Sequence, residues 1–183
     1  TRLNMNVKVI ITDGSQPIGN GIGPVLEAED VMSVLRDDPL APEDLKDKAL
    51  SMASILLEMT GKYKKGQGVK VANELLKSGK ALKSMNEIIK AQGKQKKVKL
   101  GTFNYIVRSS KVGKVKEINN EIIAKIARVG GAPEDKGAGL FLNKKVGDKV
   151  KKGEVLYTIY AENKFKLGLS KEFVKKDRGY LIN

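Results

Sequence analysis

VGDKVKKGEVLYTIYAE, residues 146–162, is the stretch that decides the fold of the C-terminal half of the chain. Gly147 and Gly153 bracket a lysine-rich turn, and β-branched and aromatic residues alternate behind it from Val155 to Tyr160. A period of two behind a glycine-punctuated turn is typical of a β-hairpin. The stretch therefore predicts a hairpin whose second strand begins near Val155.

The composition excludes several classes of chemistry. The 183 residues include no cysteine and no histidine. Disulfides, thiol nucleophiles and cysteine-based zinc sites are therefore excluded, and the commonest general base is missing. A self-contained hydrolase or transferase that uses either residue is not expected, and we predict neither a metal nor a cofactor.

The chain is strongly basic, with 35 lysines and arginines against 21 acidic residues and a net charge of +14. This balance permits nucleic-acid binding. We favour a lysine-rich, ion-paired surface of the thermophile kind, because the lysines are scattered and aromatic stacking platforms are few. Neither a signal peptide nor the roughly 20 apolar residues of a membrane helix is found. We expect a cytoplasmic protein with no membrane partner and no specific nucleic-acid partner.

The first half of the sequence predicts one strand and four helices. Val7–Thr12 is a β-branched run that reads as a buried strand ending in a turn. A glycine-rich loop follows it. Apolar residues then recur at helical spacing in four segments: 24–36, 42–59, 68–78 and 81–92. Gly61, Gly79 and Gly93 predict the ends of the last three helices.

The apolar faces of these helices predict how they pack. The face of segment 42–59 is wide, which places this helix inside a helical layer. The last two helices are expected to point the following apolar residues inward: Val71, Leu75 and Leu76, then Leu82, Met85, Ile88 and Ile89. An unpaired strand at Val7–Thr12 would be an aggregation-prone edge, so we expect an intermolecular contact there and a homo-oligomer.

The character of the chain changes at a charged break, residues 94–97, which places a domain boundary at about residue 95. Strand alternation returns after it, in segments 98–100, 103–108, 113–118 and 139–142. Asn119 or Asn120 is expected to cap a helix over 121–128. Phe165, Leu169 and Phe173 predict a closing helix, and 180–182 predicts a final strand. The fold class is α/β over residues 1–95 followed by α+β over 96–183.

Two glycine-dense loops are candidates for ligand binding. Gly19, Gly21 and Gly23 lie between a predicted strand and a helix, where a phosphate would be attracted. Their spacing is that of neither a P-loop nor a dinucleotide loop, and acidic residues fill the next turn: Glu27, Glu29 and Asp30. We favour a tight connection there. The second loop, residues 130–139, reads as a long turn in which glycines permit close backbone packing or positive φ.

Lys164 raises a separate possibility. The Gly147-Asp148-x-Val150-x-x-Gly153-x-x-Leu156 pattern resembles the opening of lipoyl and biotinyl carrier domains, which carry a modified lysine near this position. Such a domain needs further strands after the lysine, whereas the residues that follow Lys164 read as a helix. Lys164 is therefore interpreted as a solvated lysine at a helix start, and the hairpin as a barrel-sandwich piece without a prosthetic group.

Two segments together resemble the thymidine and pyrimidine nucleoside phosphorylases. The first is Thr12-Asp13-Gly14-Ser15-Gln16-Pro17-Ile18-Gly19, followed by residues 21–28; the second runs from Gly113 to Gly153. Within that family, residues 131–139 and the ending Tyr160-Ala161-Glu162 are most similar to archaeal AMP phosphorylases. The resemblance covers nearly the whole chain in order.

The resemblance implies an enzyme that uses phosphate as co-substrate to cleave AMP into adenine and ribose 1,5-bisphosphate. The family's phosphate- and base-binding segments precede the stretch matched here, so no catalytic, cofactor-binding or metal residue is carried over. The chain is expected to be an inactive C-terminal part of a longer subunit. It would supply one strand and four helices of the catalytic domain and an α+β module with a barrel-sandwich or hammerhead-like sheet. A thymidine or pyrimidine nucleoside phosphorylase, or a carrier domain, is the alternative.

Overall fold

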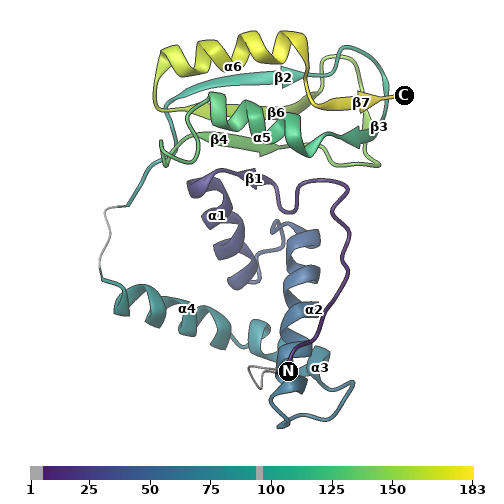
Figure 1. Ribbon diagram of the computed structural model, residues 1–183, viewed down its shortest axis with the longest axis vertical. Coiled ribbons are helices and arrows are strands. Elements are labelled where there is room, and N and C mark those ends of the chain that lie inside the picture. The colour runs from purple at the N-terminus through teal and green to yellow at the C-terminus, as the bar shows by residue number, and fades with distance from the viewer. Residues whose placement is uncertain (1–5, 94–96) are drawn as a thin grey trace. The chain divides into compact units, whose positions relative to one another are not determined.

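The computed structural model describes residues 6–93 and 97–183, which form six helices and seven strands (Figure 1). The chain divides into two compact units. A helical unit comprises residues 1–14 and 33–94, and a sheet unit comprises residues 15–32 and 95–183. The sheet unit thus combines residues 15–32 with the C-terminal part of the chain. No described helix is long and apolar enough to cross a membrane.

The four helices predicted in the first half are all present. They are α1 (Pro24–Leu35), α2 (Glu43–Met59), α3 (Gly68–Lys77) and α4 (Lys80–Ala91). The predicted glycine stops are confirmed, because Gly61, Gly79 and Gly93 follow these helices with φ of 74°, 71° and 87°. A residue without a Cβ adopts this left-handed conformation without strain. In the helical unit α2 packs on α3, and α3 on α4.

The prediction of a buried strand at Val7–Thr12 was wrong. The segment belongs to no strand of the structure, and its side chains are exposed, with Val9 and Ile11 at 84% and 98%. A strand needs a neighbour to satisfy its backbone groups, and no described strand pairs with this segment. Within the described residues this segment therefore has no strand partner.

The packing predicted for α2 and α4 was also wrong. Ser54 is the one residue of α2 that is buried, while Met52 and Leu56 are exposed. No residue of α4 is buried, and Ile88 and Ile89 lie at the surface. In α3 the buried apolar side chains are those of Ala72 and Leu76. The apolar stripes exist, but the described chain does not cover them.

The sheet unit contains two antiparallel sheets. The first has the order β1 (Gly21–Ile22), β4 (Gly139–Leu142), β6 (Val155–Ala161) and β2 (Phe103–Arg108). The second has the order β5 (Lys149–Val150), β3 (Gly113–Ile118) and β7 (Tyr180–Ile182). The turn at 151–154 therefore leads from one sheet to the other, so β5 and β6 are not a paired hairpin. Residues 98–100 form no strand.

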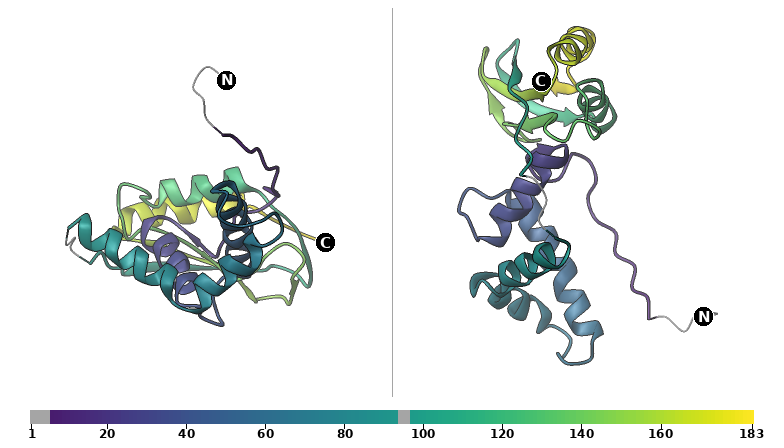
Figure 2. Two further views of the ribbon diagram at one scale, coloured as in Figure 1. Left: turned by 90° about the horizontal axis from the view of Figure 1, so that it is seen from below. Right: turned by 90° about the vertical axis from the view of Figure 1, so that its left-hand side faces the viewer.

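Two helices cover one side of the four-stranded sheet (Figure 2, right). They are α5 (Asn120–Val129) and α6 (Lys164–Lys176). Asn119 is the predicted cap of α5, since its side chain accepts the Ile122 N–H at 3.1 Å. Asn163 caps α6 by accepting from Phe165 and Lys166. Each such cap stabilises a helix by about 1 kcal/mol.

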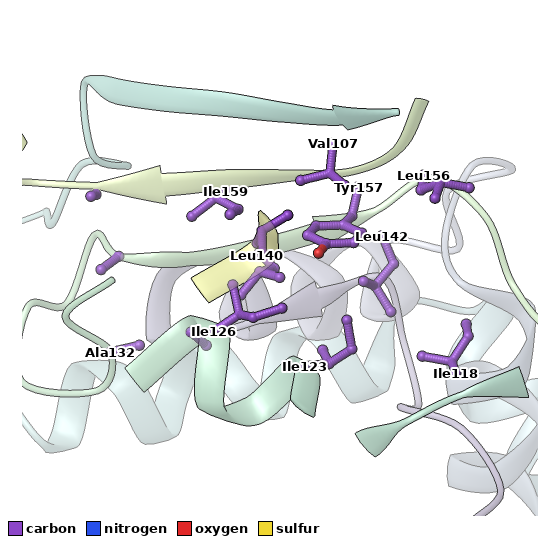
Figure 3. Packing of buried hydrophobic residues seen from close by; sticks show 14 of the residues in the cluster. Val107, Ile118, Ile123, Ile126, Ala132, Leu140, Leu142, Leu156, Tyr157 and Ile159 are labelled. Carbon is purple, nitrogen blue, oxygen red and sulfur yellow. The ribbon is translucent and has the colours of Figure 1, made fainter. Parts of the chain in front are cut away.

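The core of the sheet unit lies between these helices and the sheet. Ile123 and Ile126 of α5 point toward Leu140, Tyr157 and Ile159 of the strands (Figure 3). All five side chains are almost completely buried. Burial of each stabilises the fold by about 2 kcal/mol relative to exposure. The period-two alternation of β6 thus produces a well-packed interior.

Candidate functional site

The structure brings the two glycine-dense loops together in the sheet unit. β1 pairs with β4 so that Gly21 faces Phe141 and Ile22 faces Leu140. The pairing continues beyond β1, where the Leu142 N–H donates to the Asn20 carbonyl oxygen at 2.8 Å. We call this region the glycine junction; it consists of residues 15–30, 135–146 and 162. The sequence predicted both loops but not their contact.

Glycine is required at the junction because the two backbones nearly touch. A Cβ added to Gly139 would lie 2.1 Å from the Ile22 carbonyl oxygen, and one on Gly137 would lie 2.4 Å from the Lys99 carbonyl oxygen. Close backbone packing, one of the two roles expected for this loop, is therefore confirmed. Gly23 is required both for a positive φ and for close packing. Its φ is +111°, and an added Cβ would lie 2.4 Å from the Ala138 carbonyl oxygen.

Carboxylates of α1 occupy the backbone donors of the first loop. Asp30 is buried and accepts the N–H groups of Asn20 and Gly21, each at 2.6 Å. Glu27 accepts the Gly23 N–H at 2.9 Å. These are the donors that a phosphate at the start of α1 would need. The chain therefore uses them for its own carboxylates, which favours the tight connection over a phosphate cradle.

Lys145 and Val146, at the start of the stretch that leads to β5, also bind the first glycine-dense loop. The Lys145 ammonium donates to the Pro17 carbonyl oxygen at 2.7 Å and also to that of Gly19. The Val146 N–H donates to the Gln16 side-chain oxygen at 2.8 Å. Charged donors form the stronger hydrogen bonds of proteins. Residues 145 and 146 thus fix residues 16–19 to the sheet unit.

The second loop is fixed by side chains from the end of β6 and from α6. Glu162 accepts the Gly137 N–H at 2.6 Å, and Lys166 forms an ion pair with Asp135 at 2.7 Å. Segments 131–139 and 160–162 are therefore in direct contact through the hydrogen bond between Gly137 and Glu162.

Lys164 does not have the geometry of a carrier lysine. It is the first residue of the 13-residue helix α6, and its side chain is exposed. A carrier lysine protrudes from a hairpin tip, so this position offers no swinging arm. The interpretation as a solvated lysine agrees with the structure.

Among the residues that the structure describes, the other polar side chains assemble no reactive group. Asp135 pairs with Lys166, and Asp148 accepts the Lys145 N–H within its own turn. Burial raises the pKa values of Tyr157 and Tyr180 far above their ordinary range, so both hydroxyls stay neutral. Those hydroxyls donate to the carbonyl oxygens of Arg178 and Lys144. Within the described residues no group of acidic residues could hold a metal ion.

The helical unit contains an apolar hollow with a volume of about 370 Å³. It lies among α2, α3 and the ends of α1 and α4. We call it the helical groove. Lys46 is its one charged lining residue and is bonded to Asp37. The groove offers apolar surface but no polar constellation that could catalyse a reaction.

The comparisons with known proteins identify the family. A family model described as the pyrimidine nucleoside phosphorylase C-terminal domain matches residues 114–179. A protein of Methylococcus capsulatus named "Putative thymidine phosphorylase" is 43% identical over 182 residues, covering 99% of this chain and 35% of that protein. The chain corresponds to the C-terminal portion of the pyrimidine nucleoside phosphorylase family.

Two further similar proteins also match most of this chain while being much longer than it. A protein of Nitrobacter hamburgensis, also named "Putative thymidine phosphorylase", is 52% identical over 86% of this chain and 31% of its own length. The AMP phosphorylase of Methanococcus aeolicus is 43% identical over 95% of this chain and 35% of its own length. The chain thus spans about a third of the length of these relatives.

The family resemblance predicted from the two sequence segments is therefore confirmed, and the carrier-domain alternative is not favoured. The predicted archaeal and thermophilic origin finds no support, because many of the similar proteins are bacterial. Sequence analysis missed Asp30, Glu27 and Lys145 as the residues that hold the junction. The acidic residues after the glycine loop were the available signal, since a carboxylate one turn into a helix can accept N–H groups at its start.

Proposed function

We propose that this chain is the C-terminal part of an enzyme that cleaves AMP with phosphate, giving adenine and ribose 1,5-bisphosphate. The observation that carries the proposal is similarity over nearly the whole chain to longer phosphorylases, among them an AMP phosphorylase that is 43% identical. We favour AMP as the substrate because the sequence of segments 131–139 and 160–162 resembles that of AMP phosphorylases. We expect the enzyme to be cytoplasmic, homo-oligomeric and independent of any cofactor.

The role proposed for this chain is structural. Its backbone donors and carboxylates at the glycine junction bind each other, which leaves the junction as a rigid support. The proposed catalytic groups lie in the part of the longer polypeptide that precedes this stretch. We infer that the two sheets form the barrel-sandwich module expected from the sequence, and that the module positions residues 15–30 for the catalytic domain.

Phosphorolysis of thymidine is the second candidate. It is favoured by several similar proteins that carry the name thymidine phosphorylase, including two that are 43% and 52% identical. The two candidates share the attack of phosphate on a glycosidic carbon. They differ in whether the substrate carries a 5′-phosphate.

A substrate panel tests the proposal. The longer polypeptide is incubated with phosphate and, separately, AMP, CMP, UMP, adenosine, thymidine or uridine, and release of the free base is measured by chromatography. We expect base release from AMP that depends on phosphate. Preference for thymidine would favour the second candidate, and inactivity on every substrate would contradict both. The 183-residue chain, assayed in parallel, is expected to release no base above the uncatalysed background.

A further inference from the structure

A further hollow lies in the sheet unit, where the C-terminal end of α6 meets β2 (Figure 1). It has a volume of about 240 Å³ and is lined by residues 105–108 of β2 and by Val174, Lys175 and Arg178. We call it the arginine hollow. Pockets for drug-sized ligands measure about 300–1,000 Å³, so this one fits a smaller molecule. β2 is the edge strand of its sheet, so no described strand lies beside the hollow on its outer side.

Arginine is concentrated at this hollow. The chain contains five arginines and 30 lysines, and two of the five, Arg108 and Arg178, line the arginine hollow. A guanidinium presents a planar fork of N–H donors that matches a phosphate or carboxylate with two parallel hydrogen bonds, whereas an ammonium acts as a point charge. In a chain that otherwise uses lysine for its positive charge, the two guanidiniums indicate recognition of an oxyanion.

Hydrogen bonds fix both guanidiniums at the hollow without using most of their donors. The Arg108 guanidinium donates to the Gly153 carbonyl oxygen at 3.0 Å, and that of Arg178 donates to the Arg108 carbonyl oxygen at 3.3 Å. Each guanidinium keeps several N–H groups for a ligand. Within the described residues neither arginine forms an ion pair with a carboxylate. The hollow thus holds two positioned cations without a carboxylate partner.

The charges around the arginine hollow favour an anion. Residue 108 and residues 171–178 together carry five cationic side chains and two carboxylates. Both carboxylates are engaged, because Glu172 accepts from the Lys175 ammonium at 2.6 Å and Asp177 accepts the Gly179 N–H at 2.8 Å. The hydrogen bond to Glu172 raises the pKa of Lys175, so this lining residue stays charged.

The helix dipole explains part of this charge. Lys175 and Lys176 lie in the last turn of α6, where cations complement the partial negative charge of the helix end. Arg108 lies on β2, and Arg178 lies two residues beyond α6, so neither belongs to that turn. The dipole therefore accounts for the lysines and leaves the two arginines unexplained.

We propose that the arginine hollow binds the phosphate group of a small molecule through Arg108 and Arg178, with Lys175 as a third cation. A phosphate monoester carries a charge of about −1.5 to −2 and three acceptor oxygens. It therefore matches three cations better than a carboxylate does, which has a single charge and two oxygens. The volume of the hollow admits the phosphate and a small attached group. This site goes beyond the proposed function and does not depend on it.

Titration followed by NMR tests the site. The Nε–H resonances of the five arginines of the 183-residue chain are recorded as inorganic phosphate replaces chloride at constant ionic strength. We expect the resonances of Arg108 and Arg178 to shift and to saturate together, because both guanidiniums bind one ligand. Arg128, an exposed arginine of the same unit that does not line the hollow, is the matched control and should shift less than about a fifth as far. Shifts that are absent, unsaturated or equal at all three arginines would overturn the proposal.

Two neighbouring lysines separate a built site from general surface charge. Lys175→Gln and Lys176→Gln remove the same charge from exposed positions in the last turn of α6, but only Lys175 lines the hollow. Lys175→Gln is expected to weaken phosphate binding at least threefold, and Lys176→Gln less than 1.5-fold. Both are surface substitutions, so the melting temperatures should stay within about 2 °C of the wild type. Equal losses of affinity would show a diffuse field and would overturn the proposal.

Substitution of arginine by lysine tests the guanidinium fork. Arg178→Lys keeps the positive charge and loses the planar fork, so the affinity for phosphate is expected to fall at least fivefold. Arg128→Lys is the control and should change the affinity less than 1.5-fold. An Arg178→Lys variant that binds phosphate as the wild type does would contradict the proposal.

A comparison of ligands identifies the source of the phosphate. Inorganic phosphate, ribose 5-phosphate and AMP are titrated separately, and the tightest of the three gives the class of ligand. We expect inorganic phosphate to bind at least tenfold more tightly than acetate, and ribose 5-phosphate at least tenfold more tightly than ribose; equal affinities within these pairs would overturn the proposal. None of these measurements uses activity. Saturable binding beside an inactive longer polypeptide would reject the proposed function alone, and an active one without this binding would reject the phosphate site alone.

Discussion

The sheet unit and the helical unit differ in how completely they bury their apolar residues. In the sheet unit, helices α5 and α6 close over a sheet whose central side chains are fully buried. In the described part of the helical unit, the buried apolar side chains are those of Val34, Ala72 and Leu76, while comparable residues of α2 and α4 are exposed. Because burial of apolar surface is the main favourable term in folding, the sheet unit is the better stabilised of the two within the described residues.

The same contrast holds for polar groups. At the glycine junction, buried carboxylates and backbone donors satisfy each other within the sheet unit. Val7–Thr12 in the helical unit instead presents an extended backbone that pairs with no described strand. Satisfied polar groups stabilise a fold, whereas free ladder positions invite a partner.

The largest expected effect is a cavity in the sheet unit. Ile126→Ala, at a fully buried position of α5, should lower the free energy of unfolding by about 3 kcal/mol, since it leaves a cavity. Ile88→Ala, on the exposed side of α4, is the matched control and should change it by less than about 0.5 kcal/mol. Urea unfolding followed by circular dichroism measures both. Equal losses in the free energy of unfolding would contradict the difference in apolar burial between the two units.

The close approach at the glycine junction gives the next effect. Gly139→Ala forces a methyl group against the Ile22 carbonyl oxygen and should destabilise the sheet unit by about 2 kcal/mol. Gly168→Ala, in the interior of α6 with no atom near its added Cβ, should instead stabilise it by about 0.5 kcal/mol. Thermal unfolding should show opposite shifts. A harmless Gly139→Ala would mean that β1 does not pair with β4.

The carboxylate of Asp30 provides a smaller test. Asp30→Ala leaves the Asn20 and Gly21 N–H groups without this acceptor and should cost about 1.5 kcal/mol. Glu29→Ala, at the exposed neighbouring position, should remain within about 0.5 kcal/mol of the wild type. The comparison is made by chemical unfolding. Identical free energies of unfolding for the two variants would show that Asp30 does not stabilise the glycine junction.

The smallest effect concerns pH. A hydrogen bond from Lys144, and then one from the Lys151 backbone, lower the pKa of Glu154 from its ordinary value of 4.5. A lowered pKa in the folded state adds stability that is present above pH 4.5 and is lost as the pH falls toward the folded-state value. Glu154→Gln should therefore make the melting temperature fall slightly less steeply as the pH is lowered below 4.5. An unchanged acid limb would show that this ion pair contributes nothing.

Local periodicity predicted most of the elements. The helical spacing between residues 24 and 92 and the glycines at 61, 79 and 93 fixed four helices and their ends. Asn119 marked the start of α5, because a side-chain acceptor in front of an apolar stripe is a local signal. Such features depend on residues a few positions apart, so a sequence is sufficient to find them.

Long-range partnership could not be predicted in the same way. Nothing in the spacing of Gly21 or Gly139 predicts that they belong to paired strands, because the two residues lie 118 positions apart in the sequence. Residues 146–162 likewise predicted a hairpin of two strands, but β5 and β6 belong to different sheets. The apolar stripe of α4 and the run at Val7–Thr12 predicted burial that the described chain does not provide. In each case the outcome depends on a partner distant in sequence, and at Val7–Thr12 the predicted strand itself is absent.

The central claim is that this chain supports a phosphorylase without carrying its chemistry. The most direct test is ³¹P NMR of AMP and inorganic phosphate, incubated with the longer polypeptide and, separately, with an equal concentration of the 183-residue chain. We predict that resonances of ribose 1,5-bisphosphate grow only in the sample that contains the longer polypeptide. Their growth with the 183-residue chain, or their absence with the longer polypeptide together with inactivity on thymidine, would contradict the account.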